Sequence, residues 1–167
     1  MRLLIILAFA AVAVSLVASA SAATKPEVQA YLNAVRPPTG EYQQRLRAIS
    51  VTIDRILFTK TSLARTAVRL RRHGAALRLI AARSEKVKPP SVLATPHRSL
   101  TRSFALMAES MNALASGLEV GDFNESAYVG PVTKAQKLQR YWRDEFIVLL
   151  RRALIPVPLW LKTLGTE

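Results

Sequence analysis

The chain has 167 residues, half of them hydrophobic, and contains no cysteine. This composition excludes disulfides and thiolate metal sites, so packing alone must stabilise the fold. Lysine and arginine outnumber aspartate and glutamate by 24 to 11, which gives a formal net charge of +13. Such a charge attracts anionic polymers and membrane surfaces through a field that salt screens. The alternative is codon bias without function, because 17 of the 24 basic residues are arginine and alanine is abundant.

The first residues have the pattern of a signal peptide. Arg2 supplies a positive start, residues 3–17 are apolar apart from Ser15, and the small residues of 18–23 fit a cleavage site. We therefore expect residues 1–22 to be removed and residues 23–167 to form one secreted or extracytoplasmic domain. The alternative is an uncleaved membrane anchor, because residues 3–23 are uncharged and reach the roughly 20 residues that span a bilayer.

Proline and glycine divide the rest of the chain into segments with helical periodicity, and none shows sustained strand alternation. A short helix is expected over residues 26–35, with Thr24 as a candidate N-cap. After Pro37-Pro38-Thr39-Gly40, apolar residues recur every seven positions over residues 41–83: Tyr42, Ile49, Ile56, Leu63, Leu70 and Leu77. Lys60 and Gly74 interrupt the companion positions, and Gly74 permits a close helix approach. The stripe predicts one long helix, and the alternative is a break at residues 59–62, where threonine or serine can cap a new helix.

Two further helices are expected in the second half of the chain. Thr95 followed by Pro96 predicts an N-cap and a first-turn proline, and one continuous stripe follows: Leu100, Phe104, Met107, Met111, Leu114 and Leu118. The last helix is expected over residues 131–155, ended by Pro156, with an inward face of Ala135, Leu138, Trp142, Phe146, Leu149 and Ala153. The fold class is therefore all-α, an up-and-down bundle of three to four helices.

The turn before the third segment carries a weak resemblance. It reads Pro89-Pro90-Ser91-Val92-Leu93-Ala94-Thr95-Pro96-His97-Arg98-Ser99-Leu100. This Pro-Pro, Leu, His and Leu spacing resembles a pattern found in small, secreted, all-helical bacterial proteins of no assigned function. The resemblance implies export and an all-helical fold, and nothing about chemistry. Pro96 departs from the pattern because it restricts where the helix can start.

His97 joins the apolar stripe of the third segment, three residues before Leu100. There it is a candidate ligand or pH-sensitive group, and the alternative is a structural histidine that ties the loop to the end of the bundle. His73 stands beside two arginines and is expected at the surface. Two histidines, with no Glu-x-x-His pair, do not provide a metal site, and no catalytic motif occurs. We expect no cofactor, no metal and no enzymatic activity.

The basic run from Arg65 to Lys88 is the best candidate for a binding site. Only Glu85 opposes its eight basic residues, and on a helix Arg65, Arg69 and Arg72 share one face roughly opposite the apolar stripe. The alternative is a solvated outer face without a ligand. The candidate anion-binding residues are Arg65, Arg69, Arg71, Arg72, Arg78, Arg83, Lys86 and Lys88.

Three hypotheses for function follow. The first is an exported, non-enzymatic bundle whose basic run binds an anionic envelope polymer or a membrane surface. The second is an interaction module that docks another exported protein through the 41–83 helix or through the apolar tail Val157-Pro158-Leu159-Trp160-Leu161-Lys162. Such a tail can also fold back over its own bundle. The third is a small-ligand carrier or enzyme with a site near His97. Nucleic acid is not an expected partner, because the protein is exported and its basic run lacks interleaved aromatic residues.

Overall fold

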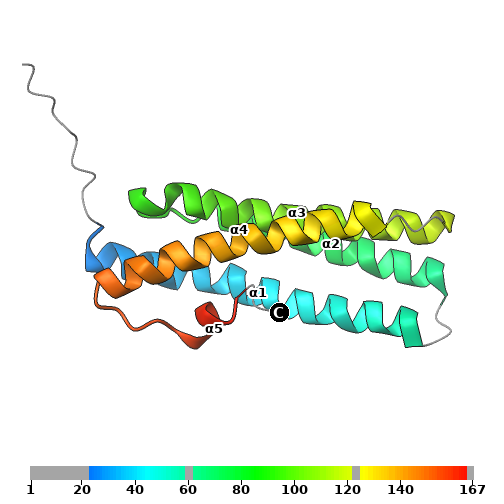
Figure 1. Ribbon diagram of the computed structural model, residues 1–167, viewed down its shortest axis with the longest axis horizontal. Coiled ribbons are helices and arrows are strands. Elements are labelled where there is room, and N and C mark those ends of the chain that lie inside the picture. Colours follow the sequence, from blue (N-terminus) through cyan, green and yellow to red (C-terminus); the bar gives the residue numbers. More distant parts are fainter. Residues whose placement is uncertain (1–22, 59–61, 122–124, 165–167) are drawn as a thin grey trace, which may run out of the picture.

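The structure, a computed structural model, describes residues 23–58, 62–121 and 125–164. Within these ranges the chain forms four long helices, one turn of 3-10 helix and a short C-terminal helix, with no strand. Each long helix runs antiparallel to the one before it, and the four pack as an elongated bundle (Figure 1). The all-α expectation is confirmed. The expected signal peptide lies outside the described residues.

Helix α1 spans Lys25–Phe58 and runs through Pro37 and Pro38, so the expected helix end near residue 35 is wrong. A proline inside a helix removes the hydrogen bond to the carbonyl four residues earlier. The carbonyls freed here belong to Asn33 and Ala34, and both residues are exposed, so water can bond to them. The helix continues because its buried stripe lies on both sides of the prolines: Val28, Tyr31, Val35, Tyr42 and Ile49.

The seven-residue stripe is divided between two helices. Helix α2 spans Leu63–Glu85 and packs antiparallel to α1, with Ser62 at its N-cap position. The expected single helix over residues 41–83 is therefore wrong, and the alternative break is right, although residues 59–61 lie outside the described residues. The phase continues across the break because both helices bury their stripe in one core, to which Leu70 and Leu77 contribute from α2.

Small residues bring α2 close to helix α3, which spans Ala94–Val120. A Cβ on Gly74 would lie 2.8 Å from Oδ1 of Asn112 and 3.2 Å from the Ala108 carbonyl oxygen. Close approach at Gly74 was expected from the sequence, and here α3 is the neighbour that requires it. The buried alanines of the two helices are Ala67, Ala81, Ala108 and Ala115.

The starts of α1 and α3 differ in how well the sequence predicted them. Thr24 caps α1 as expected, since its backbone N–H donates to Oε2 of Glu27 at 2.7 Å and its Oγ1 accepts the Glu27 N–H at 3.5 Å. Thr95 does not cap α3. The 3-10 turn η1 (Ser91–Leu93) leads directly into α3, so Leu93 holds the N-cap position and Pro96 is the third helical residue, two residues deeper than expected. This is tolerated because the first turn leaves its N–H groups unpaired in any case.

Helix α4 spans Glu125–Arg152 and contains Pro131, so it begins before the expected boundary at that proline. Trp142 and Phe146 are buried as expected, while Gln139 and Leu150 are buried more completely than the expected Leu138 and Leu149. The helix ends after Arg152, ahead of Pro156. The Ile155 N–H donates to the Leu150 carbonyl at 2.9 Å, and Leu154 takes the left-handed φ of 55° that glycine usually supplies at this place.

The C-terminal tail folds back along the side of the bundle. Helix α5 (Leu159–Lys162) lies against α1 and α4, and both Leu161 and Leu164 are buried. Arg143 Nη1 donates to the Leu164 carbonyl at 2.9 Å, and Gln43 Nε2 donates to the Trp160 carbonyl at 3.5 Å. The apolar tail is therefore largely used within its own chain.

Candidate functional site

The basic run lies on the outer face of α2 and on the loop after it. All eight candidate residues are exposed, from Arg65 to Lys88. Arg65, Arg69 and Arg72 surround a shallow hollow of about 330 Å³ whose other lining residues are Ala64 and Val68. The helical spacing that predicted a shared face thus brings three arginine side chains to one shallow hollow. We call these three residues the arginine cluster.

Two of the eight candidates are already paired with carboxylates of neighbouring helices. Arg71 Nε donates to Oε1 of Glu119 on α3 at 3.0 Å, and Arg83 Nη1 donates to Oε1 of Glu41 on α1 at 3.0 Å. The hydrogen bond from Arg71 holds the pKa of Glu119 below its ordinary value. These two arginines connect helices, and sequence spacing alone did not separate them from the rest. The other six have no ion pair among the described residues: Arg65, Arg69, Arg72, Arg78, Lys86 and Lys88.

Apolar side chains interrupt the charge on this face. Val68 is 48% exposed and Leu79 is 66% exposed, and both lie on the outer side of α2 among the arginines. A solvated helix face without a ligand normally carries polar residues at such positions. The outer side of α2 therefore carries aliphatic as well as basic side chains.

His97 lies in a buried hydrogen-bonded network that joins all four long helices. Its Nε2 donates to the Ser84 carbonyl at the end of α2 at 3.0 Å, and its Nδ1 lies 2.9 Å from the Tyr31 hydroxyl of α1. Trp142 Nε1 of α4 donates to the same hydroxyl at 2.9 Å. Each of the three side chains is at most 4% exposed.

The direction of each hydrogen bond in this network follows from its ends. A carbonyl only accepts, so Nε2 of His97 carries the hydrogen and Nδ1 accepts from the Tyr31 hydroxyl, which in turn accepts from Trp142. The network is complete with a neutral imidazole, and burial lowers the pKa of His97 below its ordinary value, opposed in part by the bond to Ser84. His97 lines none of the hollows described here. The geometry therefore fits a histidine that ties the loop to the bundle.

His73 is half-buried between α2 and α1, not at the surface as expected. Arg45 Nη1 lies 3.4 Å from its Nδ1, and its Nε2 lies 3.3 Å from Oγ1 of Thr52. Burial, and then the charge of Arg45, lower the pKa of His73. The seven-residue pattern places His73 beside the stripe, and this was the signal that it faces a neighbouring helix.

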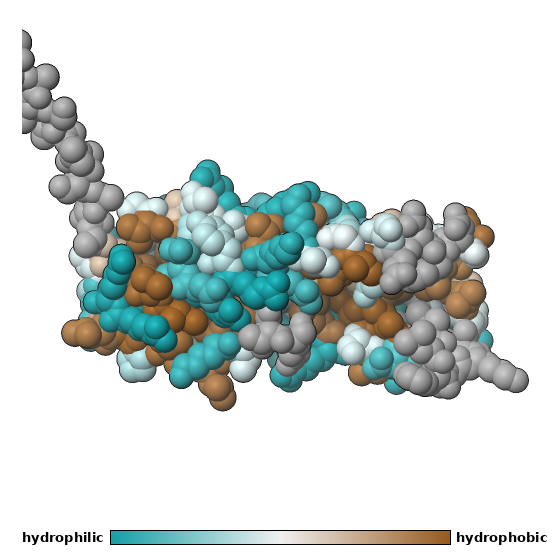
Figure 2. All heavy atoms as spheres, viewed as in Figure 1, coloured by the Kyte–Doolittle hydropathy of each residue, from teal (hydrophilic) through white to brown (hydrophobic). Residues whose placement is uncertain are grey.

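Sequence reasoning missed a groove between α1 and α4. These two helices approach less closely than α2 and α3 or α3 and α4. Two hollows of about 410 and 620 Å³ lie next to each other along this seam and share four lining residues, and we call the two together the α1–α4 groove. The shared residues are Leu46, Arg47, Met107 and Gln136. Apolar surface is visible between the two helices on the right half of the face shown in Figure 2.

Together these features define an all-helical bundle with an exposed basic face, a buried polar network and one side groove. Within the described ranges, no group of three or more histidine, cysteine, aspartate or glutamate residues is placed to hold a metal ion. No helix in the same ranges combines the length and apolar character needed to cross a membrane. Comparison of the chain with protein-family models, curated proteins and solved structures gave no match.

Proposed function

We propose that this protein is an exported, non-enzymatic helical bundle that binds an anionic component of the cell envelope through the outer face of α2. The observation that carries the proposal is the arginine cluster, in which Arg65, Arg69 and Arg72 surround one hollow and have no carboxylate partner among the described residues. Three unpaired guanidinium groups on one concave surface favour phosphate or carboxylate groups, which they can bind with two parallel hydrogen bonds.

A membrane surface is the favoured source of these anions because of Val68 and Leu79. Both side chains are exposed within the basic face, and burying them among lipid headgroups removes apolar area from water while the arginines contact phosphate. A hydrophilic polymer offers only the second of these contributions. The basic face therefore has the composition expected for a lipid-facing helix.

The test compares vesicles with a soluble polyanion. The full chain is sedimented with vesicles of phosphatidylglycerol and phosphatidylcholine, with vesicles of phosphatidylcholine alone, and its binding to long-chain polyphosphate is measured in parallel. Substituting the arginine cluster by serine removes about 3 kcal/mol at roughly 1 kcal/mol for each cation, or about a hundredfold in affinity. Binding should also weaken as the Debye length shrinks from about 10 Å at 0.1 M salt to 3 Å at 1 M.

A matched control separates this face from net charge. Arg36, Arg140 and Arg151 are exposed and have no ion pair among the described residues, so changing these three to serine alters the charge equally without touching α2. Equal weakening by both triple variants would mean that overall charge, and not the α2 face, drives binding. Leu79→Ser should weaken vesicle binding only, and an equal effect on polyphosphate would exclude the membrane as the favoured source.

The other hypotheses have less support from the geometry. Most described residues of the stripe expected to dock a partner are buried inside the bundle, and so is Leu161 of the tail, while Leu63 and Leu159 are exposed. His97 lines none of the hollows described above, so the geometry gives a carrier site there no support.

A further inference from the structure

The α1–α4 groove changes character along its length. Beside α5 it is lined by amide and hydroxyl groups, among them Gln43, Gln139 and Thr163. Farther along, the lining is mostly aliphatic or thioether, with Ile53 and Met111 among its members. The hollows of about 410 and 620 Å³ each fall within the roughly 300–1,000 Å³ of typical small-molecule sites. We call the part beside α5 the polar compartment after these groups and the other part the apolar compartment, although apolar surface predominates in both.

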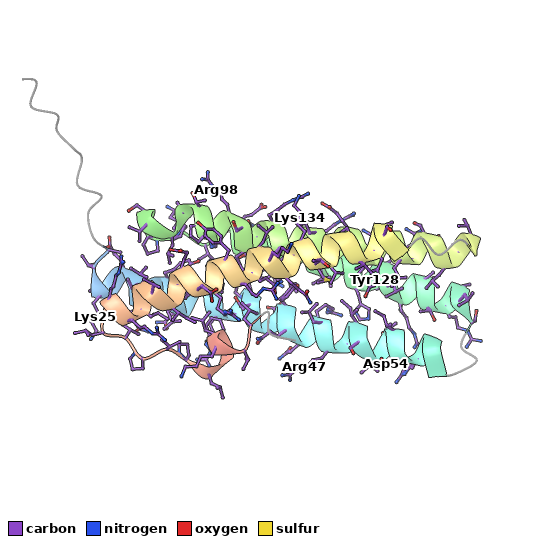
Figure 3. The ribbon with its side chains drawn as sticks, viewed as in Figure 1. Lys25, Arg47, Asp54, Arg98, Tyr128 and Lys134 are labelled. Carbon is purple, nitrogen blue, oxygen red and sulfur yellow. The ribbon has the colours of Figure 1, made fainter. Side chains whose placement is uncertain are left out.

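The charged residues that line the groove differ between its two compartments. Arg47 lines both compartments, is exposed, and has no ion pair among the described residues. Asp54 lines only the apolar compartment and follows two helical turns later, roughly 10 Å along α1. In Figure 3, Arg47 and Asp54 lie along the same edge of α1, with Tyr128 of α4 between the two helices. An anionic group is therefore attracted to Arg47, where the two compartments meet, and repelled by Asp54 farther along the apolar compartment.

Two methionines line the groove near the place where the compartments meet. Met107 lines both compartments and Met111 lines the second one. Unbranched, polarizable thioethers adapt to flexible apolar ligands better than branched side chains do. A rigid aromatic ligand would need a more closely shaped cavity than this shallow groove provides.

From this juxtaposition we infer that the α1–α4 groove binds a single-chain anionic amphiphile of the fatty-acid class. The carboxylate pairs with Arg47 beside the amide of Gln43, and the acyl chain lies over Met107 and Met111 toward Val132. Each methylene that leaves water adds to the affinity. Since the groove lies on α1 and α4, and the basic face lies on α2, either proposal can fail without the other.

Trp160 provides a local reporter for this site. It lines the polar compartment, whereas Trp142 is fully buried in the network around Tyr31. Two dodecanoates are titrated into the full chain below their micellar concentration, one brominated next to the carboxylate and one brominated at the far end of the chain. Bromine quenches tryptophan on contact, so the first should quench strongly and the second weakly. Trp160→Phe should abolish the quenching while calorimetry still detects binding.

Three variants test the assignment. Arg47→Glu should weaken binding about tenfold to a hundredfold, because a charge-assisted hydrogen bond contributes about 1.5–3 kcal/mol. Val132→Phe should fill the apolar compartment and weaken binding at least as much, while Val129→Phe, at a position 40% exposed and outside the groove lining, should not. Circular dichroism establishes that each variant is folded. No binding below the micellar concentration, equal quenching by the two probes, or equal affinity of the two phenylalanine variants would overturn the inference.

Discussion

The hydroxyl of Tyr31 is the central group of the buried network, and its removal gives the sharpest test of what holds the four helices together. Tyr31→Phe leaves the Trp142 N–H without an acceptor and Nδ1 of His97 without a donor, and both side chains are buried. Exchanging the imidazole tautomer cannot repair this, because Nε2 must keep its hydrogen for the Ser84 carbonyl. Each unsatisfied buried group costs about 1–3 kcal/mol, so the free energy of unfolding should fall by about 2–6 kcal/mol.

The assay is equilibrium urea unfolding followed by circular dichroism, with thermal unfolding in parallel. For a domain of this size, the lower bound of about 2 kcal/mol corresponds to a fall in Tm of roughly 4–8 °C. Tyr141→Phe is the matched control, because Tyr141 is 43% exposed and removing its hydroxyl orphans no buried group. It should change stability by less than about 0.5 kcal/mol.

A double-mutant cycle with His97→Gln tests the coupling directly. The two residues share one hydrogen bond, so the double variant should be less destabilised than the sum of the singles by about 0.5–3 kcal/mol. Additive effects, or a Tyr31→Phe variant as stable as Tyr141→Phe, would refute the reasoning that the network stabilises the bundle.

Four further outcomes follow from particular residues. Because the pKa of His97 is lowered in the folded state, the unfolded chain binds the proton first, so the free energy of unfolding should fall as the pH drops below about 6.5. His97→Gln should reduce this pH dependence in urea unfolding, and an unchanged pH dependence would contradict the reasoning. Gly74→Leu should cost at least about 1–3 kcal/mol against Asn112 and Ala108, while Gly40→Leu, with nothing within 4 Å, should cost less than about 0.5 kcal/mol. Pro37→Ala should raise stability by about 2 kcal/mol by restoring a helical hydrogen bond, and a loss of stability would indicate a helix break at that point. Leu154→Gly should raise Tm, since relieving the left-handed φ of an 82% exposed side chain gains about 1 kcal/mol, and a fall in Tm would mean that the leucine side chain matters more than its backbone strain.

The sequence identified the helical stripes but not where the helices end. Apolar spacing along α3 predicted its buried face well, because helical period and burial on one side are local properties of the chain. The same spacing misled at residues 41–83, since a seven-residue phase can continue from one helix to the next when both helices face one core. The rule that proline ends a helix failed at Pro37-Pro38. Burial of the stripe on both sides of the prolines stabilises the helix by more than the two lost hydrogen bonds destabilise it.

The candidate site also has some features that the sequence predicted and others that depend on the tertiary structure. Charge on α2 follows from composition and helical spacing, so the sequence located the arginine cluster, but it did not show that Arg71 and Arg83 pair with carboxylates more than 40 residues away. His97 was singled out from its position on a stripe, whereas its partners on α1, α2 and α4 come from distant parts of the chain. The α1–α4 groove has no sequence signature, because it depends on the distance between two helices that are not neighbours in the chain. Thus the sequence alone determined the all-helical class and the basic face, and only the tertiary structure decided which charges are free, which polar groups are buried together and where the bundle leaves space for a ligand.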